Sequence, residues 1–170
     1  MKTIIFMCLL ILANVAGAEN LQIGKDEAVE IYTKTKPIEI NNISVPIAYG
    51  YHTKEAEGLC AIANAKNTIH ALVLVDNGGE RFPLCAGIKT PVITKIDQDF
   101  YATYPYYVKD LSDVPIRTAY QPVKLTKDGF YQCKEEDRII DAIKHNLKAK
   151  MPIKKAVERA IKKTGCTIIQ

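Results

Sequence analysis

Histidine and cysteine are the residue types in this sequence that would support catalysis, and they are few and scattered. The three histidines are His52, His70 and His145, and none has a sequence context typical of a cysteine protease. A small exported hydrolase using His52 or His70 beside an acidic residue is the enzymatic alternative. The chain contains no Gly-x-Ser-x-Gly, His-Glu-x-x-His, P-loop or Gly-x-Gly-x-x-Gly motif. We therefore expect a protein that is not an enzyme and has no catalytic residues.

The cysteines point to disulfides rather than to redox or metal chemistry. Beyond the N-terminal apolar run lie Cys60, Cys85, Cys133 and Cys166. An even number is typical of two disulfides in an oxidising compartment. Cys-x-x-Cys pairs and closely spaced metal ligands are absent from the sequence, so we expect neither a metal nor a cofactor. Four cysteines allow three pairings; we favour Cys60–Cys85 and Cys133–Cys166, because each pair brackets one expected helical unit.

Residues 1–18 have the features of a cleavable signal peptide. Lys2 is followed by the apolar run 4–12, and Ala16-Gly17-Ala18 forms a cleavage site before Glu19. An N-terminal membrane anchor is the alternative interpretation. No later apolar run approaches the roughly 20 residues of a membrane span. We expect a periplasmic or secreted protein with no membrane span.

Composition predicts one globular domain over residues 19–170. Hydrophobic residues make up 48% of the 170 residues and charged residues 25%, which argues against a disordered chain. The net charge of +4 is too small to indicate a nucleic-acid partner.

The charge is unevenly distributed along the chain. Residues 134–166 contain ten basic and five acidic residues, whereas residues 19–133 have a net charge of −2. This basic end is either a solvated face or a contact for an acidic partner or an anionic envelope surface. Its lysines include Lys148, Lys150, Lys154, Lys155, Lys162 and Lys163.

The elements that would position these residues are expected to be mostly helical, with an α+β arrangement as the alternative. Apolar residues three or four apart predict a helix over 53–75, although 71–75 also fits a buried strand. Thr90 and Pro91 are suited to begin a second helix that ends before Pro105. The β-branched residues 92–94 keep a strand open there. Residues 105–132 are expected to be a loop with one short strand near 118–125, and 19–52 to contain a short β segment.

The clearest pattern is a helical hairpin over residues 134–165. Apolar residues with helical spacing occur on both sides of the break at Met151-Pro152, and Gly165 is a suitable helix end. Cys133 and Cys166 flank the two open ends of this hairpin. A disulfide between them would hold two antiparallel helices together.

Tyrosines are concentrated between residues 100 and 107. Either Phe100 and Tyr104 are core and the others anchor loops, or the exposed members bind a protein partner, because tyrosine is enriched at interfaces. The predicted partner-binding residues are Tyr101, Tyr106 and Tyr107.

Two segments carry a resemblance to a known family. They are Gly58-Leu-Cys60-Ala-Ile-Ala-Asn-Ala with Phe82-Pro-Leu-Cys85, and the apolar helix pair from Cys133 to Cys166. Together they resemble the Tai/Rap-type periplasmic immunity proteins of type VI secretion. The chain ends its helix pair with Gly165-Cys166, where that family usually has Pro-Cys. The resemblance implies a periplasmic inhibitor of a peptidoglycan amidase, with the four cysteines structural.

These observations together predict an exported, non-catalytic protein-binding factor. The most specific form is an immunity or inhibitor protein that binds and blocks a cell-wall-degrading toxin or effector enzyme. A carrier of a small apolar ligand, or a structural envelope component, is the further alternative. The domain would be a monomer or a homodimer.

Overall fold

The structure is a computed structural model, and it describes seven stretches of the chain. These are residues 22–23, 26–27, 30–54, 58–64, 68–70, 84–109 and 116–169. The predicted signal peptide, residues 1–18, lies outside them. The described residues form thirteen strands and two helices.

The larger sheet is antiparallel and has the strand order β10-β11-β12-β13, with β9 paired to the far half of β11. Its long central strands run opposite each other from Phe100↔Leu125 to Val108↔Arg117. Asp97, at a φ of 54°, turns β10 into β11. The strands are β9 (Leu84–Ile88), β10 (Val92–Ile96), β11 (Asp99–Lys109), β12 (Arg117–Thr126) and β13 (Gly129–Gln132).

The smaller sheet has the order β3-β6-β7-β8 and is also antiparallel. Its end strand β3 contains a bulge, because the register to β6 shifts between Ile31 and Thr33 and leaves Tyr32 as the extra residue. The strands are β3 (Glu30–Lys34), β6 (Ile47–His52), β7 (Leu59–Ala63) and β8 (Thr68–His70). Two further strand pairs are separate from both sheets: β1 (Gln22–Ile23) with β2 (Asp26–Glu27), and β4 (Ile38–Ile40) with β5 (Ile43–Val45).

The helices α1 (Glu136–Lys148) and α2 (Ile153–Thr164) form the predicted C-terminal hairpin, and this prediction is confirmed. Gly165 ends α2 with a φ of 79°, a conformation that glycine adopts without strain. Asn146 on α1 is buried and donates its side-chain N–H to the Ala156 carbonyl of α2 at 3.0 Å. This bond ties the two helices together.

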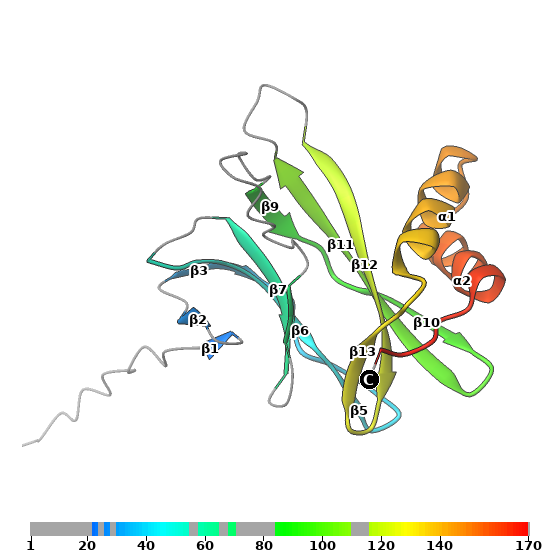
Figure 1. Ribbon diagram of the computed structural model, residues 1–170, viewed down its shortest axis with the longest axis horizontal. Coiled ribbons are helices and arrows are strands. Elements are labelled where there is room, and N and C mark those ends of the chain that lie inside the picture. The colour runs from blue at the N-terminus through cyan, green and yellow to red at the C-terminus, as the bar shows by residue number, and fades with distance from the viewer. Residues whose placement is uncertain are drawn as a thin grey trace, which may run out of the picture.

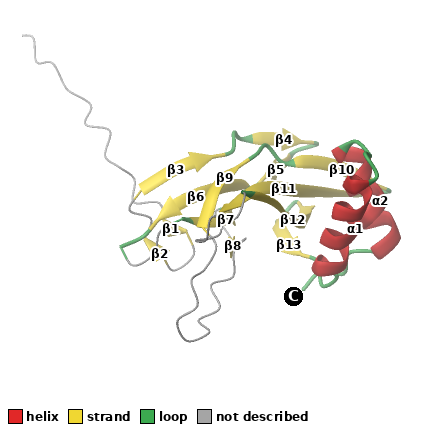
Figure 2. Cartoon of the chain, turned by 90° about the horizontal axis from the view of Figure 1, so that it is seen from above, coloured by secondary structure: helices red, strands yellow, loops and turns green. Residues whose placement is uncertain are grey.

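The elements form three layers, with the larger sheet in the middle (Figure 1). One face of that sheet packs on the smaller sheet through buried residues such as Ala48, Ile62, Tyr104 and Phe130. The other face packs under α1 and α2, which Figure 2 shows gathered on one side of the strands. The alternation of β11 explains how one strand serves both cores: Tyr101 lies in the helix-side core and Tyr104 in the sheet-side core.

The expected mostly α fold is therefore wrong, since the described residues are mainly strand. The helix expected over 53–75 is wrong because β7 occupies Leu59–Ala63 and β8 occupies Thr68–His70, while residues 71–75 lie outside the described residues. All five residues of β7 are buried. A strand buried on both faces shows no alternation of apolar and polar residues, and a short apolar run then fits a helix equally well.

The helix expected from Thr90 to Tyr104 is also wrong. The β-branched alternative holds, since β10 and β11 form a hairpin there. The described residues of the supposed loop 105–132 instead form the end of β11, the strand β12 and all of β13. Pro105 and Pro122 lie inside paired strands, which the usual exclusion of proline from central strands disfavours. The short strand expected near 118–125 is the centre of β12.

Candidate protein-binding surface

The two disulfides join the predicted cysteine pairs, and both pairings are confirmed. Cys60 on β7 pairs with Cys85 on β9, with a Cα–Cα distance of 5.5 Å, and so connects the two sheets. Cys133 pairs with Cys166 at 4.9 Å and closes the open end of the helical hairpin. The expectation that each pair brackets a helical unit holds for Cys133–Cys166 alone, because the described residues between Cys60 and Cys85 form strands. Two disulfides are consistent with an oxidising compartment.

His52, one of the two candidate histidines, is held by neighbouring groups at the end of β6. Its Nδ1 accepts a hydrogen bond from the Gly58 backbone N–H at 3.0 Å, and its ring lies 4.7 Å from the Tyr32 ring. The Tyr32 hydroxyl in turn donates to the Cys85 carbonyl at 2.5 Å. Because Nδ1 already accepts this backbone hydrogen bond, it is occupied and not open to a substrate. This arrangement favours a structural role for His52.

Gly58 is what makes this arrangement sterically feasible. Its φ is 64°, and a Cβ at this position would lie 2.8 Å from the Leu84 Cβ. Its carbonyl also accepts a hydrogen bond from Cys85 N–H at 2.6 Å. Gly58 therefore lets β7 begin close to β9, where Cys60 and Cys85 are linked.

The other two histidines lie on different elements from His52. His70 lies on β8 opposite Ala61, and its side chain is outside the described residues. His145 lies in the last turn of α1, among the helices rather than the strands of the smaller sheet. The described residues contain no group of three or more His, Cys, Asp or Glu side chains placed to hold a metal ion.

The three candidate tyrosines all lie on β11, but they do not form one exposed surface. Tyr101 is 5% exposed under the helices, and Tyr106 is 7% exposed on the opposite face, beside Cys60 and Cys85. Tyr107 is partly exposed and carries the Lys89 ammonium 4.8 Å above its ring. A role in partner binding stays a prediction for Tyr107 and has no exposed side chain to act through at Tyr101 and Tyr106.

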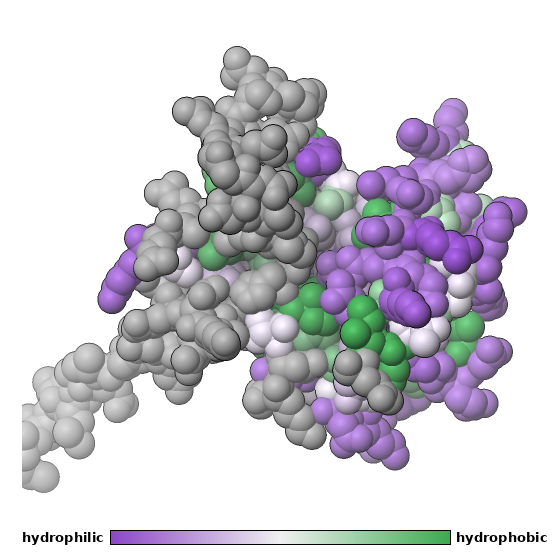
Figure 3. Space-filling model, in the orientation of Figure 1, coloured by the Kyte–Doolittle hydropathy of each residue, from purple (hydrophilic) through white to green (hydrophobic). Residues whose placement is uncertain are grey.

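The helical side of the molecule is rich in exposed charge. Figure 3 shows hydrophilic side chains dominating the surface over α1 and α2. Helix α2 has five basic residues and one acidic residue, Glu158, while its buried stripe faces the larger sheet. The basic residues are Lys154, Lys155, Arg159, Lys162 and Lys163.

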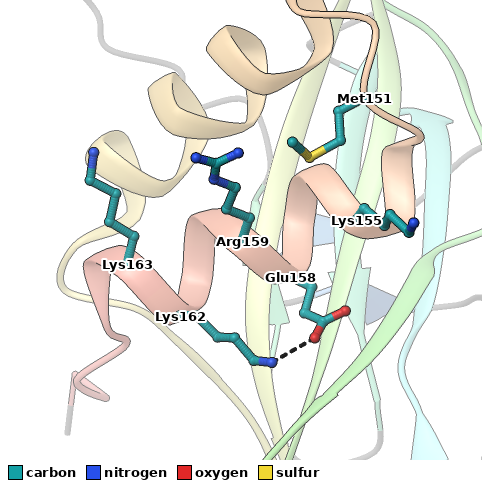
Figure 4. A pocket seen from close by; sticks show the side chains of 6 residues that line it. All are labelled: Met151, Lys155, Glu158, Arg159, Lys162 and Lys163. Atoms are coloured by element: carbon teal, nitrogen blue, oxygen red, sulfur yellow. Dashed lines mark hydrogen bonds and ion pairs between the residues drawn. The ribbon is translucent and has the colours of Figure 1, made fainter.

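The outer side of α2 is hollowed into a depression of about 630 Å³, shown in Figure 4. Lys162 pairs with Glu158 at 2.7 Å, which lowers the pKa of the Glu158 carboxyl. Lys155, Arg159 and Lys163 are exposed, and among the described residues none of them makes an ion pair. We call the lining residues the α2 basic face: Met151, Lys155, Glu158, Arg159, Lys162 and Lys163.

Sequence reasoning identified the lysines of this face but missed Met151 and Arg159. For Arg159 the available signal was spacing, because residues 155, 159 and 163 recur every four positions and so share one side of α2. Arginine is among the residues that contribute most to protein interfaces, and methionine adapts its shape to irregular partners. The combination suits recognition of a protein better than catalysis.

Comparison with protein-family models, with curated proteins and with solved structures finds no significant match to this chain. In the described part of the chain, neither helix is long and apolar enough to cross a membrane.

Proposed function

We propose that this chain is an exported, non-catalytic protein-binding factor that recognises an acidic surface of its partner through the α2 basic face. The observation that supports this is the set of three exposed cations, Lys155, Arg159 and Lys163, around Met151. Exposed charges of this kind contribute little to stability. It does steer association with a surface of opposite charge.

A protein partner fits this face better than a membrane surface. An interfacial helix binds a membrane by burying its apolar stripe among the lipids. The apolar stripe of α2 is already buried against the larger sheet, through Ala156, Val157, Ala160 and Ile161. The side of α2 that remains available is polar apart from Ile153, which is 36% exposed at the first position of the helix, so adhesion to lipid would depend mainly on charge. Self-association through this face is disfavoured, because two copies would place like charges together.

The more specific proposal is an immunity or inhibitor protein that blocks a cell-wall-degrading toxin. It rests on the resemblance of the disulfide-closed helix pair between Cys133 and Cys166 to the Tai/Rap-type immunity proteins. In this proposal the toxin carries the acidic surface, and the α2 basic face covers it. Binding alone then blocks the toxin, with no chemistry by this chain.

The experiment is a capture of partners from the exported fraction of the source organism, with both disulfides closed. The matched variant reverses three charges: Lys155→Glu, Arg159→Glu and Lys163→Glu. We expect a stoichiometric acidic partner that the unaltered chain retains, that the variant loses, and that salt releases. Retention of the same partner by both proteins, or release unaffected by salt, would contradict a role for this face. Inhibition of the captured protein's wall-degrading activity would support the immunity proposal.

A further inference from the structure

A second depression lies between the two helices and continues from the α2 basic face. It has a volume of about 460 Å³ and shares Met151, Arg159 and Lys163 with the outer depression. We call it the interhelical groove. Its polar lining comes from both helices: Asp141, His145 and Asn146 from α1, and Arg159 and Lys163 from α2.

The charges in this groove are not matched to one another. Arg159 and Lys163 are one helical turn apart and extend toward α1 (Figure 4). Asp141 is the acidic residue on the opposite wall, and it forms no ion pair with them among the described residues. Asn146 is already bonded to the Ala156 carbonyl. Two cations therefore face one acid, and the excess positive charge is open to an anionic ligand.

We propose that the interhelical groove receives carboxylate side chains from an acidic segment of the partner. Arg159 would bind one carboxylate with two parallel hydrogen bonds, since a guanidinium matches carboxylate geometry. Lys163 would contribute a second positive charge, and the His145 imidazole a further donor. This inference rests on the proposed function and names what the partner must present: closely spaced Asp or Glu residues in one exposed segment.

The length of the cationic row sets the size of that segment. Lys155 and Lys163 are eight residues apart on α2, which corresponds to roughly 12 Å along the helix axis. An extended chain covers this distance in about four residues. Two acidic residues separated by two or three others would therefore reach from the groove to the outer depression. Met151, which lines both, offers apolar contact to the residues between them.

The test uses two synthetic 12-residue peptides, one with repeats of Glu-Ala-Ala-Glu and one with glutamine in place of glutamate. Binding to the full oxidised chain is followed by NMR titration of backbone amides. We expect the glutamate peptide to shift the signals of His145, Arg159 and Lys163, and the glutamine peptide to leave them unchanged. Shifts confined to other parts of the chain, or no binding of the glutamate peptide, would overturn the proposal.

Charge-matched variants separate the groove from the general field of α2. Arg159→Glu and Lys154→Glu change the net charge equally, but Lys154 lines neither depression. We expect Arg159→Glu to weaken peptide binding about tenfold or more, and Lys154→Glu by less than about threefold. Equal weakening by the two variants would overturn the proposal that the groove is the binding site. It would still be consistent with an acidic partner that binds α2 through its overall charge. No weakening by either variant would contradict the proposed function itself.

Two other anionic probes test whether the groove prefers a phosphate group to a carboxylate. Inorganic phosphate and phosphatidylglycerol vesicles are offered to the unaltered chain and to the Arg159→Glu variant. We expect both probes to bind more weakly than the glutamate peptide. Tighter binding of either probe, lost in Arg159→Glu, would show that the groove recognises phosphate or a lipid headgroup instead. Arg159→Lys keeps the charge but loses the paired hydrogen bonds. Its affinity for the glutamate peptide should therefore lie between that of the unaltered chain and that of Arg159→Glu.

Discussion

The sandwich of two sheets and the C-terminal helical hairpin are each closed by one disulfide, yet they are built in different ways. In the sandwich, Cys60–Cys85 joins strands from different sheets and is buried beside Tyr106 and Val108. In the hairpin, Cys133–Cys166 closes a unit whose two helices follow each other directly in the sequence. The sandwich therefore depends on contacts between distant segments, and the hairpin on contacts within one segment.

This difference lets the sandwich supply the buried core while the hairpin presents exposed charged side chains. In the sandwich, β11 keeps Tyr104 and Tyr106 buried and leaves Tyr107 partly exposed. The hairpin buries one side of each helix against the larger sheet and turns the other side, with its cations, to solvent. A binding face can change on such a unit without altering the core beneath it.

Removal of either disulfide tests whether the two regions are separate. Loops of 25 and 33 residues predict losses of about 3–4 kcal/mol in unfolding free energy for each cysteine pair replaced by alanine. We expect similar losses measured by denaturant unfolding. The pattern of hydrogen exchange should differ between the two variants. Cys133→Ala with Cys166→Ala should speed amide exchange in α1 and α2, whereas Cys60→Ala with Cys85→Ala should speed it in β7 and β9. Identical exchange patterns in the two variants would show that the sandwich and the hairpin unfold together as one cooperative unit.

Tyr104→Phe weakens the sandwich at one point. The buried Tyr104 hydroxyl donates to the Pro46 carbonyl at 2.6 Å and so links β11 to the start of β6. Its loss should cost about 1–2 kcal/mol, because a buried carbonyl loses its donor. Binding of the glutamate peptide should stay unchanged, since α2 is in another layer. A fall in peptide affinity would show that the sandwich contributes to the binding face.

Asn146→Ala weakens the hairpin in the corresponding way. The Asn146 side chain donates a hydrogen bond to the Ala156 carbonyl of α2. After the substitution this oxygen can still accept a hydrogen bond through its other lone pair. The expected loss is about 1 kcal/mol, with faster hydrogen exchange in α2. Because Asn146 also lines the interhelical groove, peptide binding should weaken too. Unchanged binding together with reduced stability would mean that the groove tolerates movement between the helices.

Glu136→Gln tests the junction of the two regions and has the smallest expected effect. The Glu136 carboxylate, at the start of α1, accepts hydrogen bonds from Gln121 at 2.6 Å and Gln132 at 2.7 Å. Burial raises the pKa of Glu136 above its ordinary value of 4.5, although these two bonds act in the opposite direction.

The sign of the pH effect follows from that raised pKa. Below pH 4.5 the carboxyl is protonated in both folded and unfolded chains and carries no penalty. As pH rises from 4.5 through the raised folded pKa, the unfolded chain ionises first and stability is lost. Glu136→Gln removes this loss, so the variant should gain stability relative to the unaltered chain across that window. Denaturant unfolding at a series of pH values measures it, and a constant difference would contradict the burial of this charge.

The same division explains what the sequence could predict. The hairpin was predictable because its apolar spacing, its break at Pro152 and its end at Gly165 are all local signals. The sheets were not, because Leu59–Ala63 is buried on both faces and Val92–Tyr104 has a spacing that fits a helix. The lysines of the α2 basic face were visible in the sequence. That Arg159 and Met151 line the interhelical groove follows only from the fold, which places α1 beside α2.

The bulge in β3 has a consequence for how this chain behaves at high concentration. An end strand offers unpaired backbone groups on which another copy could add, and continued addition leads to fibrils. In β3 the extra residue Tyr32 breaks the regular spacing of those groups, and the exposed side chains of Glu30 and Lys34 place charge at either end. Such an edge is a poor template for aggregation. Deletion of Tyr32 would give a regular edge and should shorten the lag time of aggregation.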